Sequence, residues 1–393
     1  MSNRSKSSPF ALMLRLSDIA GCLHVLRMTV SEMTKFRELL LGSIVVTLTV
    51  ISVVIVSEIA LRFLPVATGI RTIPVTEQQP VFRFAPNQTF VYSRDWNMRL
   101  ANTGRINNAG FVSDHPYRAN GNFPLVAVIG DSMVEAAMVP FAETISARLA
   151  RALSPIRVYS FGASGAPLSQ YLIWARHAVR DYGATALVIV VVGNDFDESL
   201  WSYASSPGFW RYAPNDSDEL QLRLLDYRPG RFRDLVYASA LARYLVFNLQ
   251  VGNFRSPIFL GRYAGNTSAD ASPERLRDSV AAINAFLRDL PSYSELPPSR
   301  VMFLVDGMRY REVAAAQAGS YFATMRTTFI DLARQKGYGA IDLDDQFFRQ
   351  DDERFEFVND GHWNSAGHRV ACTAALTAST LIQIRSVTSG ACD

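Results

Sequence analysis

Residues 125–132 read Leu-Val-Ala-Val-Ile-Gly-Asp-Ser, an apolar run that passes directly into a Gly-Asp-Ser turn. A continuous apolar strand is typical of a parallel sheet that is covered on both faces. Ligands of open parallel sheets bind at the carboxyl ends of the strands, so this run delivers Ser132 to the expected functional edge. A serine hydroxyl is a weak nucleophile until a base removes its proton, and the pattern therefore calls for a histidine from another loop.

The chain after Pro124 alternates short apolar runs with longer amphipathic stretches. We expect strands at Leu125–Ile129, Arg157–Tyr159, Ala186–Val192, Val301–Val305 and Ala340–Leu343. We expect helices at Thr144–Leu153, Ser169–Tyr182, Pro273–Leu290 and Glu312–Lys336. This alternation predicts parallel pairing through right-handed crossovers, and hence a three-layer α/β/α fold. The third and fourth strands are separated by about a hundred residues, far more than a crossover needs, which predicts an inserted lid or subdomain at about 200–270.

The histidine that Ser132 needs is expected in the block Asn359-Asp360-Gly361-His362-Trp363-Asn364, which follows the fifth strand and precedes a helix. Asp360 stands two residues before His362, close enough to accept the proton on Nδ1 and fix the tautomer. Nε2 then faces Ser132 as the general base. A Ser–His pair without an acid remains the alternative.

An oxyanion intermediate also requires hydrogen-bond donors, and two further loops offer them. The loop 160–165 follows the second strand, and Gly165 lacks the Cβ that would keep its backbone N–H from a reacting carbonyl. Gly193-Asn194-Asp195 follows the third strand, and the Asn194 amide can donate another hydrogen bond. We expect the two loops to follow adjacent parallel strands. Ser132, Gly165 and Asn194 are thus the predicted oxyanion hole.

These four blocks resemble those of the SGNH (GDSL-like) hydrolase superfamily, in which a Ser in Gly-Asp-Ser, a Gly, an Asn and a His occur in this order with an Asp near the His. The resemblance covers roughly residues 124–385 through short motifs. It implies a flavodoxin-like sheet, no metal, and ester hydrolysis or acyl transfer. Many members place the acid three residues before the His, where this chain has Asn359. The spacing Asp-x-His-Trp resembles the branch related to envelope and exopolysaccharide O-acetylation proteins and favours Asp360.

One stretch near the start is long enough to cross a membrane. Leu39 to Ser57 runs 19 residues without a charge, close to the length of a spanning helix. Six Lys and Arg residues precede it, whereas Arg71 and Arg83 are the basic residues in the next part of the chain. This asymmetry predicts a single-pass protein of the cytoplasmic (inner) membrane with its N-terminus in the cytoplasm and its catalytic domain outside. A buried helix and a cleaved signal peptide are the alternatives, and no small-x-small cleavage site follows the run.

The predicted organisation has five parts. A cytoplasmic segment (1–38), in which Met28 and Met33 are alternative starts, is followed by a transmembrane helix (39–64). A stalk and hairpin (65–123) then lead into the hydrolase domain (124–385), and a short tail (386–393) ends the chain. Cys372 and Cys392 either pair or remain free thiols.

The composition and the positions of individual residues argue against several functions. The net charge is +3, and no basic run interleaves with aromatics, which argues against nucleic-acid binding. The five histidines form no close pair, so neither a zinc site nor any other cofactor is expected. His115, His177 and His368 are interpreted as structural. Arg105, Arg118 and Arg309 are interpreted as solvated surface rather than as readers of an anionic glycan. The aromatic residues after Asn194 are interpreted as lid packing: Trp201, Tyr203, Phe209, Trp210 and Tyr212.

The sequence therefore predicts a membrane-anchored serine esterase that attacks acyl esters with Ser132. By family analogy, we expect an acylated envelope or extracellular glycan as substrate, with polysaccharide-assembly proteins as candidate partners. An O-acyltransferase that uses the same residues is one alternative. A non-catalytic glycan-binding assembly protein is the other.

Overall fold

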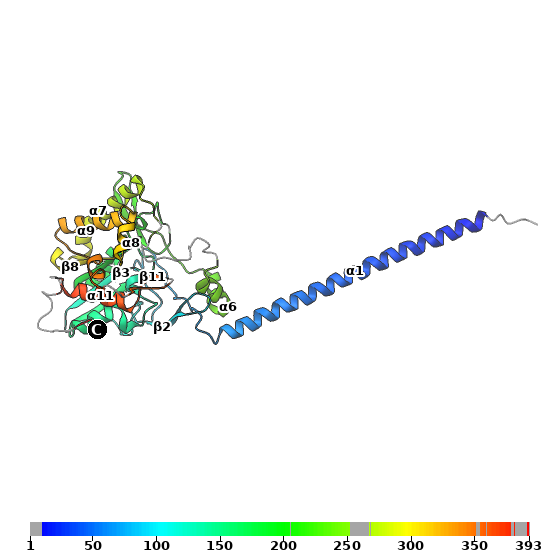
Figure 1. Ribbon diagram of the computed structural model, residues 1–393, viewed down its shortest axis with the longest axis horizontal. Helices are drawn as coiled ribbons and strands as arrows, with labels where there is room; N and C mark the ends of the chain where they lie inside the picture. Colours follow the sequence, from blue (N-terminus) through cyan, green and yellow to red (C-terminus); the bar gives the residue numbers. More distant parts are fainter. Residues whose placement is uncertain are drawn as a thin grey trace, which may run out of the picture. The chain divides into compact units, whose positions relative to one another are not determined.

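The computed structural model describes residues 10–204, 206–251, 267, 269–350, 354–358, 360–378, 381 and 391–392. The chain divides into two units, Met1–Leu64 and Pro65–Asp393. The first unit contains one helix, α1 (Phe10–Leu61), whose part Glu32–Leu61 is long and apolar enough to cross a membrane. The expected span, 39–64, coincides with the end of this helix except for residues 62–64, which form a turn (Figure 1).

The second unit is built on a five-stranded sheet in the spatial order β4-β3-β5-β8-β9, and all four neighbouring pairs are parallel. The strands are β3 (Leu125–Gly130), β4 (Arg157–Gly162), β5 (Ala184–Val191), β8 (Val301–Val305) and β9 (Gly339–Asp342). This is the doubly wound order 2-1-3-4-5 of flavodoxin-like folds, as the sequence predicts. The direction of winding reverses at β3, which therefore lies between β4 and β5.

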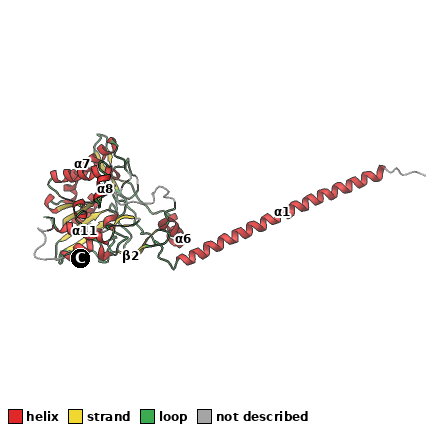
Figure 2. Ribbon diagram, in the orientation of Figure 1, coloured by secondary structure: helices red, strands yellow, loops and turns green. Residues whose placement is uncertain are grey.

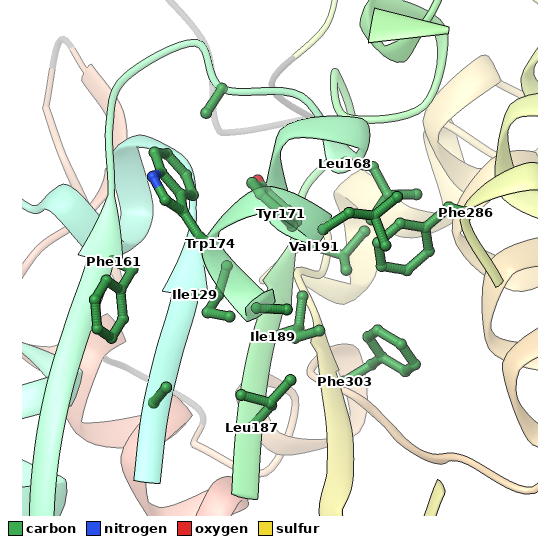
Figure 3. Close-up of a cluster of buried hydrophobic side chains, with 14 of the residues drawn as sticks. Ile129, Phe161, Leu168, Tyr171, Trp174, Leu187, Ile189, Val191, Phe286 and Phe303 are labelled. Atoms are coloured by element: carbon green, nitrogen blue, oxygen red, sulfur yellow. The ribbon is translucent and has the colours of Figure 1, made fainter. Parts of the chain in front are cut away.

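Helices cover both faces of the sheet, as Figure 2 shows by colour. One face is covered by α4 (Leu168–Tyr182), α7 (Pro273–Ser294) and α9 (Tyr321–Gln335). The other is covered by α3 (Ile145–Ala152) and α11 (Ser365–Leu376). Alternate residues of each strand serve the two layers: Ile129 packs with the α4 layer and Val128 with the α11 layer. Figure 3 shows the first layer, where Trp174 and Tyr171 of α4 lie over the strands.

The expected helix Glu312–Lys336 is two helices. Residues Arg311–Ala316 form α8, and α9 starts at Tyr321, after a turn in which Gly319 has φ +80°. The Ser320 side chain caps α9 by accepting a hydrogen bond from the Ala323 N–H. Smaller elements complete the core: α2 (Ser132–Glu135), η1 (Phe141–Glu143), η2 (Asp197–Ser199), η4 (Pro298–Arg300), α10 (Asp344–Phe347), β10 (Glu356–Phe357) and β11 (Asp360–Trp363).

The segment 65–123, which we expected to be a stalk and hairpin, packs into the second unit instead. It contains the antiparallel hairpin β1 (Gln88–Arg94) and β2 (Leu100–Ile106). Phe82, Phe84 and Phe90 are buried in the same core as α4, and the Trp174 indole N–H donates to the Phe82 carbonyl at 2.9 Å. Burying three aromatic side chains contributes substantially to folding. The hairpin is therefore part of the folded second unit and does not act as a spacer.

The insertion between β5 and β8 starts with the antiparallel pair β6 (Trp210–Pro214) and β7 (Leu220–Leu224). It continues through α5 (Arg231–Ala238), α6 (Ala240–Arg243) and a π-helical turn, η3 (Tyr244–Asn248). Residues 252–266 of the expected insertion lie outside the described part. Phe209 and Tyr212 of the aromatic run after Asn194 are buried in the main core, which agrees with a packing role.

Candidate active site

The nucleophile candidate Ser132 is the first residue of α2, immediately after strand β3. The Asp131 carboxylate caps this helix by accepting a hydrogen bond from the Met133 N–H at 2.9 Å. The strand and the cap fix the backbone on either side of Ser132, which is 4% exposed. Its hydroxyl has two acceptors in reach, the Asp131 carboxylate at 3.1 Å and the His362 ring at 2.7 Å.

His362 reaches this serine from the antiparallel pair β10–β11, 230 positions later in the chain. Its Nε2 lies 2.7 Å from the Ser132 Oγ, and its Nδ1 is hydrogen-bonded to the Asp360 carboxylate. The same carboxylate oxygen accepts the His362 backbone N–H at 3.1 Å. The structure thus brings together Ser132, His362 and Asp360 in the arrangement of a catalytic triad. Asn359, the other candidate position for the acid, lies outside the described residues.

Two residues of strand β1 hold the second oxygen of Asp360. The Arg94 guanidinium donates to Oδ2 at 2.7 Å, and the Tyr92 hydroxyl donates to the same atom at 3.0 Å. Asp360 is buried, whereas the Arg94 side chain is partly exposed. Nothing local in the sequence signals these contacts, because they join residues more than 260 positions apart. The amino-terminal hairpin therefore completes the support of the acid.

These neighbours set the charge states of the pair. Burial alone would raise the pKa of Asp360, but the charges of His362 and Arg94 and the hydrogen bonds from His362 outweigh it and hold that pKa well below its usual range. Burial lowers the pKa of His362, but the Asp360 carboxylate outweighs it and raises the pKa above the usual value, while Arg94 acts in the opposite direction. Asp360 is thus ionised across the physiological range and stabilises an imidazolium at His362.

Replacing Arg94 with methionine is expected to shift the acid limb of the kcat/KM profile to higher pH. Arg94 lowers the pKa of His362, so its removal raises that pKa, and the base stays protonated and inactive up to a higher pH. The measurement is hydrolysis of a soluble ester from pH 4 to 9 by the wild type, Arg94→Met and Arg94→Lys. An unchanged acid limb in Arg94→Met would show that the guanidinium does not influence the base.

The oxyanion candidates lie on either side of the nucleophile strand. Gly165 follows β4 and Asn194 follows β5, and β3 runs between these two strands. We expected the two loops to follow adjacent strands, and that prediction is wrong: β3, which carries Ser132 at its end, lies between β4 and β5. Gly165 has φ +75°, a conformation that L side chains rarely adopt. Asn194 is buried, and its amide nitrogen donates to the Glu198 carboxylate at 3.2 Å.

The bond to Glu198 orients the Asn194 amide, whose NH₂ group is a hydrogen-bond donor of the kind that an oxyanion hole uses. Burial raises the pKa of Glu198. A second acid, the buried Glu135, accepts a hydrogen bond from the Ser164 N–H, next to Gly165. Burial raises its pKa as well. Neither acid was predicted as part of the site from the sequence, although Glu135 stands only one helical turn after Ser132.

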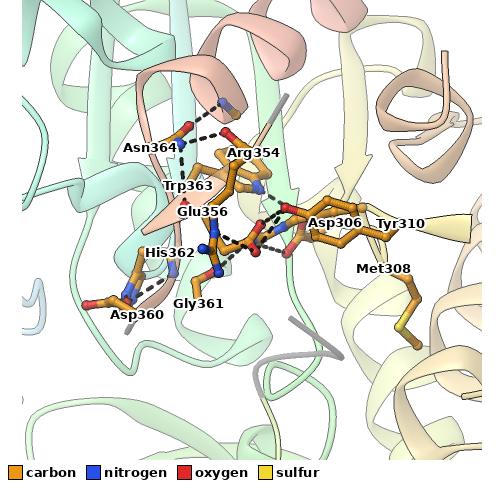
Figure 4. A network of polar contacts seen from close by, with 12 residues as sticks. Asp306, Met308, Tyr310, Arg354, Glu356, Asp360, Gly361, His362, Trp363 and Asn364 are labelled. Atoms are coloured by element: carbon orange, nitrogen blue, oxygen red, sulfur yellow. Dashed lines mark hydrogen bonds and ion pairs between the residues drawn. The ribbon is translucent and has the colours of Figure 1, made fainter. Parts of the chain in front are cut away.

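A buried polar network supports the strand that carries His362 (Figure 4). Its centre is Arg309, whose side chain is fully buried, so the prediction of a solvated arginine at this position is wrong. Arg309 donates to the Asp306 carboxylate at 2.9 Å and to the Gly361 carbonyl at 2.6 Å. Asp306 also accepts the Trp363 indole N–H at 2.9 Å. Hydrogen bonds from this network therefore hold Gly361 and Trp363, the residues on both sides of His362.

Other isolated residues have structural environments. His368 is buried, its Nδ1 accepts the Ile145 N–H at 3.2 Å, and burial lowers its pKa to about 3. His177 is bonded to Asp181 on its own helix. Arg105 and Arg118 are exposed. Cys372 and Cys392 form a disulfide, which selects one of the two alternatives. Among the described residues, no three His, Cys, Asp or Glu side chains are grouped so that they could hold a metal ion.

A cavity of about 560 Å³ lies beside the residues that hold Asp360, although Ser132, His362 and Asp360 themselves do not line it. Tyr92 and Arg94, which hold Asp360, form one part of its wall, and Glu135 and Ser164 form another. The remaining wall is largely apolar and comes from the amino-terminal segment and the insertion: Phe82, Phe84, Phe90, Tyr237, Val246 and Phe247. Its size and lining are typical of a site for a small organic group.

No family model matches this chain, and no curated protein matches it. Solved structures similar to it include a lipolytic protein of the G-D-S-L family from Veillonella parvula, with 13% identity, 64% of this chain and 96% of that chain covered, and a TM-score of 0.34. An alpha/beta hydrolase enzyme from the Lake Arreo metagenome has 16% identity, coverage of 67% and 98%, and a TM-score of 0.36. A lipase/acylhydrolase from Enterococcus faecalis has 12% identity, coverage of 67% and 96%, and a TM-score of 0.34. At such low similarity, the function must be argued from the residues of this chain.

Proposed function

We propose that this protein is a membrane-anchored serine esterase of the SGNH type that cleaves acyl esters through an acyl-enzyme. The observation that carries the proposal is the continuous chain of contacts from the Ser132 hydroxyl through His362 to Asp360. A serine, a histidine and a buried acid in this geometry generate a nucleophile at neutral pH. The acid is itself fixed by two further donors, as a preorganised site requires.

In the proposed reaction, the Ser132 Oγ attacks the ester carbonyl while His362 Nε2 takes its proton. The resulting oxyanion accepts hydrogen bonds from the backbone N–H groups of Ser132 and Gly165 and from the Asn194 amide. Collapse of the intermediate breaks the bond to the alcohol, which leaves with the proton from His362. A water molecule that His362 deprotonates then attacks the acyl-enzyme. The bond between the acyl carbon and the Ser132 Oγ breaks, His362 returns the proton to that oxygen, and the acid is released.

Replacing Asn194 with alanine is expected to lower kcat about 10²–10³-fold with a smaller change in KM, because the lost hydrogen bond forms mainly to the charged intermediate. Steady-state kinetics on a soluble acetyl ester measure this effect. Asn215→Ala, in the exposed turn between β6 and β7, is the matched control. Equal activity of Asn194→Ala and the control would show that the Asn194 amide is not part of the oxyanion hole.

An exported acylated glycan of the cell envelope is the proposed substrate class. The support is the apolar part of the cavity beside Tyr92 and Arg94, which suits an acyl group, together with the proposed anchor α1 and its basic amino-terminal flank. The N-terminus would then lie in the cytoplasm and the catalytic domain outside, where polysaccharide-assembly proteins are candidate partners. Protease accessibility of the second unit in intact spheroplasts tests this orientation.

Acyl transfer to a glycan hydroxyl is the second candidate, since the same residues can activate an alcohol in place of water. Consumption of an activated acetyl ester, measured with and without an acetyl-free glycan acceptor, separates the two reactions. Hydrolysis at the same rate without acceptor supports the esterase. Dependence on the acceptor, with the acetyl group recovered on the glycan, supports the transferase. Binding of the glycan without turnover of any ester would instead favour a non-catalytic assembly protein.

A further inference from the structure

The insertion exposes apolar side chains in one short stretch. The described residues after Pro65 include eight large hydrophobic residues that are exposed, and five of them lie between Leu235 and Val251. These five are Leu235, Leu245, Val246, Leu249 and Val251. A soluble surface carries scattered apolar residues, but a local concentration of this kind marks an interaction site. We call these five residues, with Trp96, the apolar edge; in the sequence the five flank α6, which is labelled in Figure 1.

Trp96 belongs to the apolar edge through a direct contact. The Tyr244 hydroxyl of the π-helical turn donates to the Trp96 carbonyl at 2.8 Å. The Trp96 side chain is 73% exposed, the largest exposed fraction among the large apolar side chains of this unit. Tryptophan and tyrosine are the residues enriched where a protein meets the headgroup layer of a membrane.

The apolar edge lies where the chain enters the domain. The Ala67 N–H donates to the Asn248 side chain at 3.0 Å, and the Ala67 carbonyl accepts from Arg243 at 3.4 Å. Asn248 is buried and is held in turn by the Ser93 hydroxyl at 2.8 Å. Gly69 has φ +68°, and a Cβ there would meet the Tyr237 ring at 2.4 Å. The first residues of the domain are thus packed tightly against α5, α6 and η3.

Six positions separate Ala67 from Leu61, where the candidate membrane span ends. A chain of six residues reaches at most about 20 Å when fully extended. The short connection between α1 and the domain therefore restricts which partner the apolar edge meets first. Ala67, which contacts Arg243 and Asn248, stays within that reach of the end of the span and of the lipid surface there, whereas a second copy or another protein has to be recruited.

We infer that the apolar edge lies in the headgroup layer of the bilayer that α1 crosses, so that the insertion rests on the membrane. This inference rests on the proposed membrane anchor. Lipid is the chemistry that fits, because the edge combines exposed aliphatic side chains with a tryptophan at its border. The same segment forms part of the wall of the 560 Å³ cavity through Tyr237, Val246 and Phe247. Membrane contact would therefore bring this wall of the cavity to the lipid surface.

The test uses the full-length chain with Cys22→Ser, a single added cysteine and a bimane label, reconstituted into phosphatidylcholine vesicles with or without brominated acyl chains. Leu249→Cys reports on the apolar edge, and Ile55→Cys reports on the span. Ser217→Cys, in the exposed turn between β6 and β7, is the matched control. Brominated lipid is expected to quench the label at 55 strongly, the label at 249 at least twofold more than the label at 217, and the label at 217 little.

Quenching at 55 with no more quenching at 249 than at 217 would overturn the membrane contact and leave the anchor intact. Absence of quenching at 55 would overturn the anchor and the inference together. As a second measurement, Leu245→Asp is added to the chain labelled at 249 and is expected to reduce its quenching, whereas Ser217→Asp leaves it unchanged. Retained hydrolysis of a soluble ester shows that both variants fold. Equal quenching in the two aspartate variants would also contradict the inference.

Discussion

Replacing Ser132 with alanine is expected to lower kcat for ester hydrolysis by about 10⁵–10⁶-fold while the chain stays folded. The loss is large because the hydroxyl forms the covalent intermediate, and no other described hydroxyl is bonded to the His362 Nε2. The measurement is hydrolysis of a soluble acetyl ester, with circular dichroism to check the fold. Ser217→Ala, on the exposed β6–β7 turn, is the control and is expected to retain wild-type activity.

His362→Ala is expected to lose a similar factor, and the double variant Ser132→Ala/His362→Ala is expected to be no worse than either single variant. Residues that act as one catalytic unit show this lack of additivity, because removing one already disables the other. Multiplicative losses in the double variant would mean that the serine and the histidine act independently, in conflict with the 2.7 Å contact.

Replacing Arg309 with methionine is expected to lower the free energy of unfolding by about 3–5 kcal/mol, because it leaves the Asp306 carboxylate buried without its cation. Arg309 and Asp306 are both fully buried, and the arginine also holds the Gly361 carbonyl beside His362. Activity should therefore fall together with stability. Urea unfolding of the full chain in detergent, monitored by tryptophan fluorescence, measures the effect.

Arg118→Met is the matched control for this substitution. Arg118 is exposed, and a surface substitution of this kind is expected to change the free energy of unfolding by less than about 0.5 kcal/mol. Equal stabilities of Arg309→Met and Arg118→Met would show that the buried ion pair does not stabilise the domain.

The sequence predicts the sheet and the triad geometry well because their signals are local. The apolar run before Gly130 identifies a strand that is buried on both faces, and the Gly-Asp-Ser turn follows it directly. The Asp360-Gly361-His362 spacing predicts the contact between the acid and the histidine for the same reason. Only the contact between Ser132 and His362 depends on the whole fold, because Ser132 follows β3 whereas His362 lies in β11, 230 positions later in the chain.

The parts that the sequence does not predict depend on distant contacts. Arg94 and Tyr92 look like ordinary strand residues until β1 is placed beside Asp360. Arg309 stands three residues after Asp306, but only the fold shows that both are buried and that the arginine also binds the Gly361 carbonyl, 52 positions later in the chain. The segment 65–123 reads as polar and rich in turns, yet residues 81–85 read Val-Phe-Arg-Phe-Ala, an apolar run with a single arginine. That run was the available signal that the segment packs against a core.

The most direct test of the proposed chemistry is covalent labelling of the full chain with a fluorophosphonate, followed by peptide mass spectrometry. We expect one modified residue, Ser132, in the wild type, no label in Ser132→Ala, and greatly slowed labelling in His362→Ala. Label that persists in Ser132→Ala, or a wild type that remains unlabelled at Ser132, would contradict the assignment of this serine as the nucleophile.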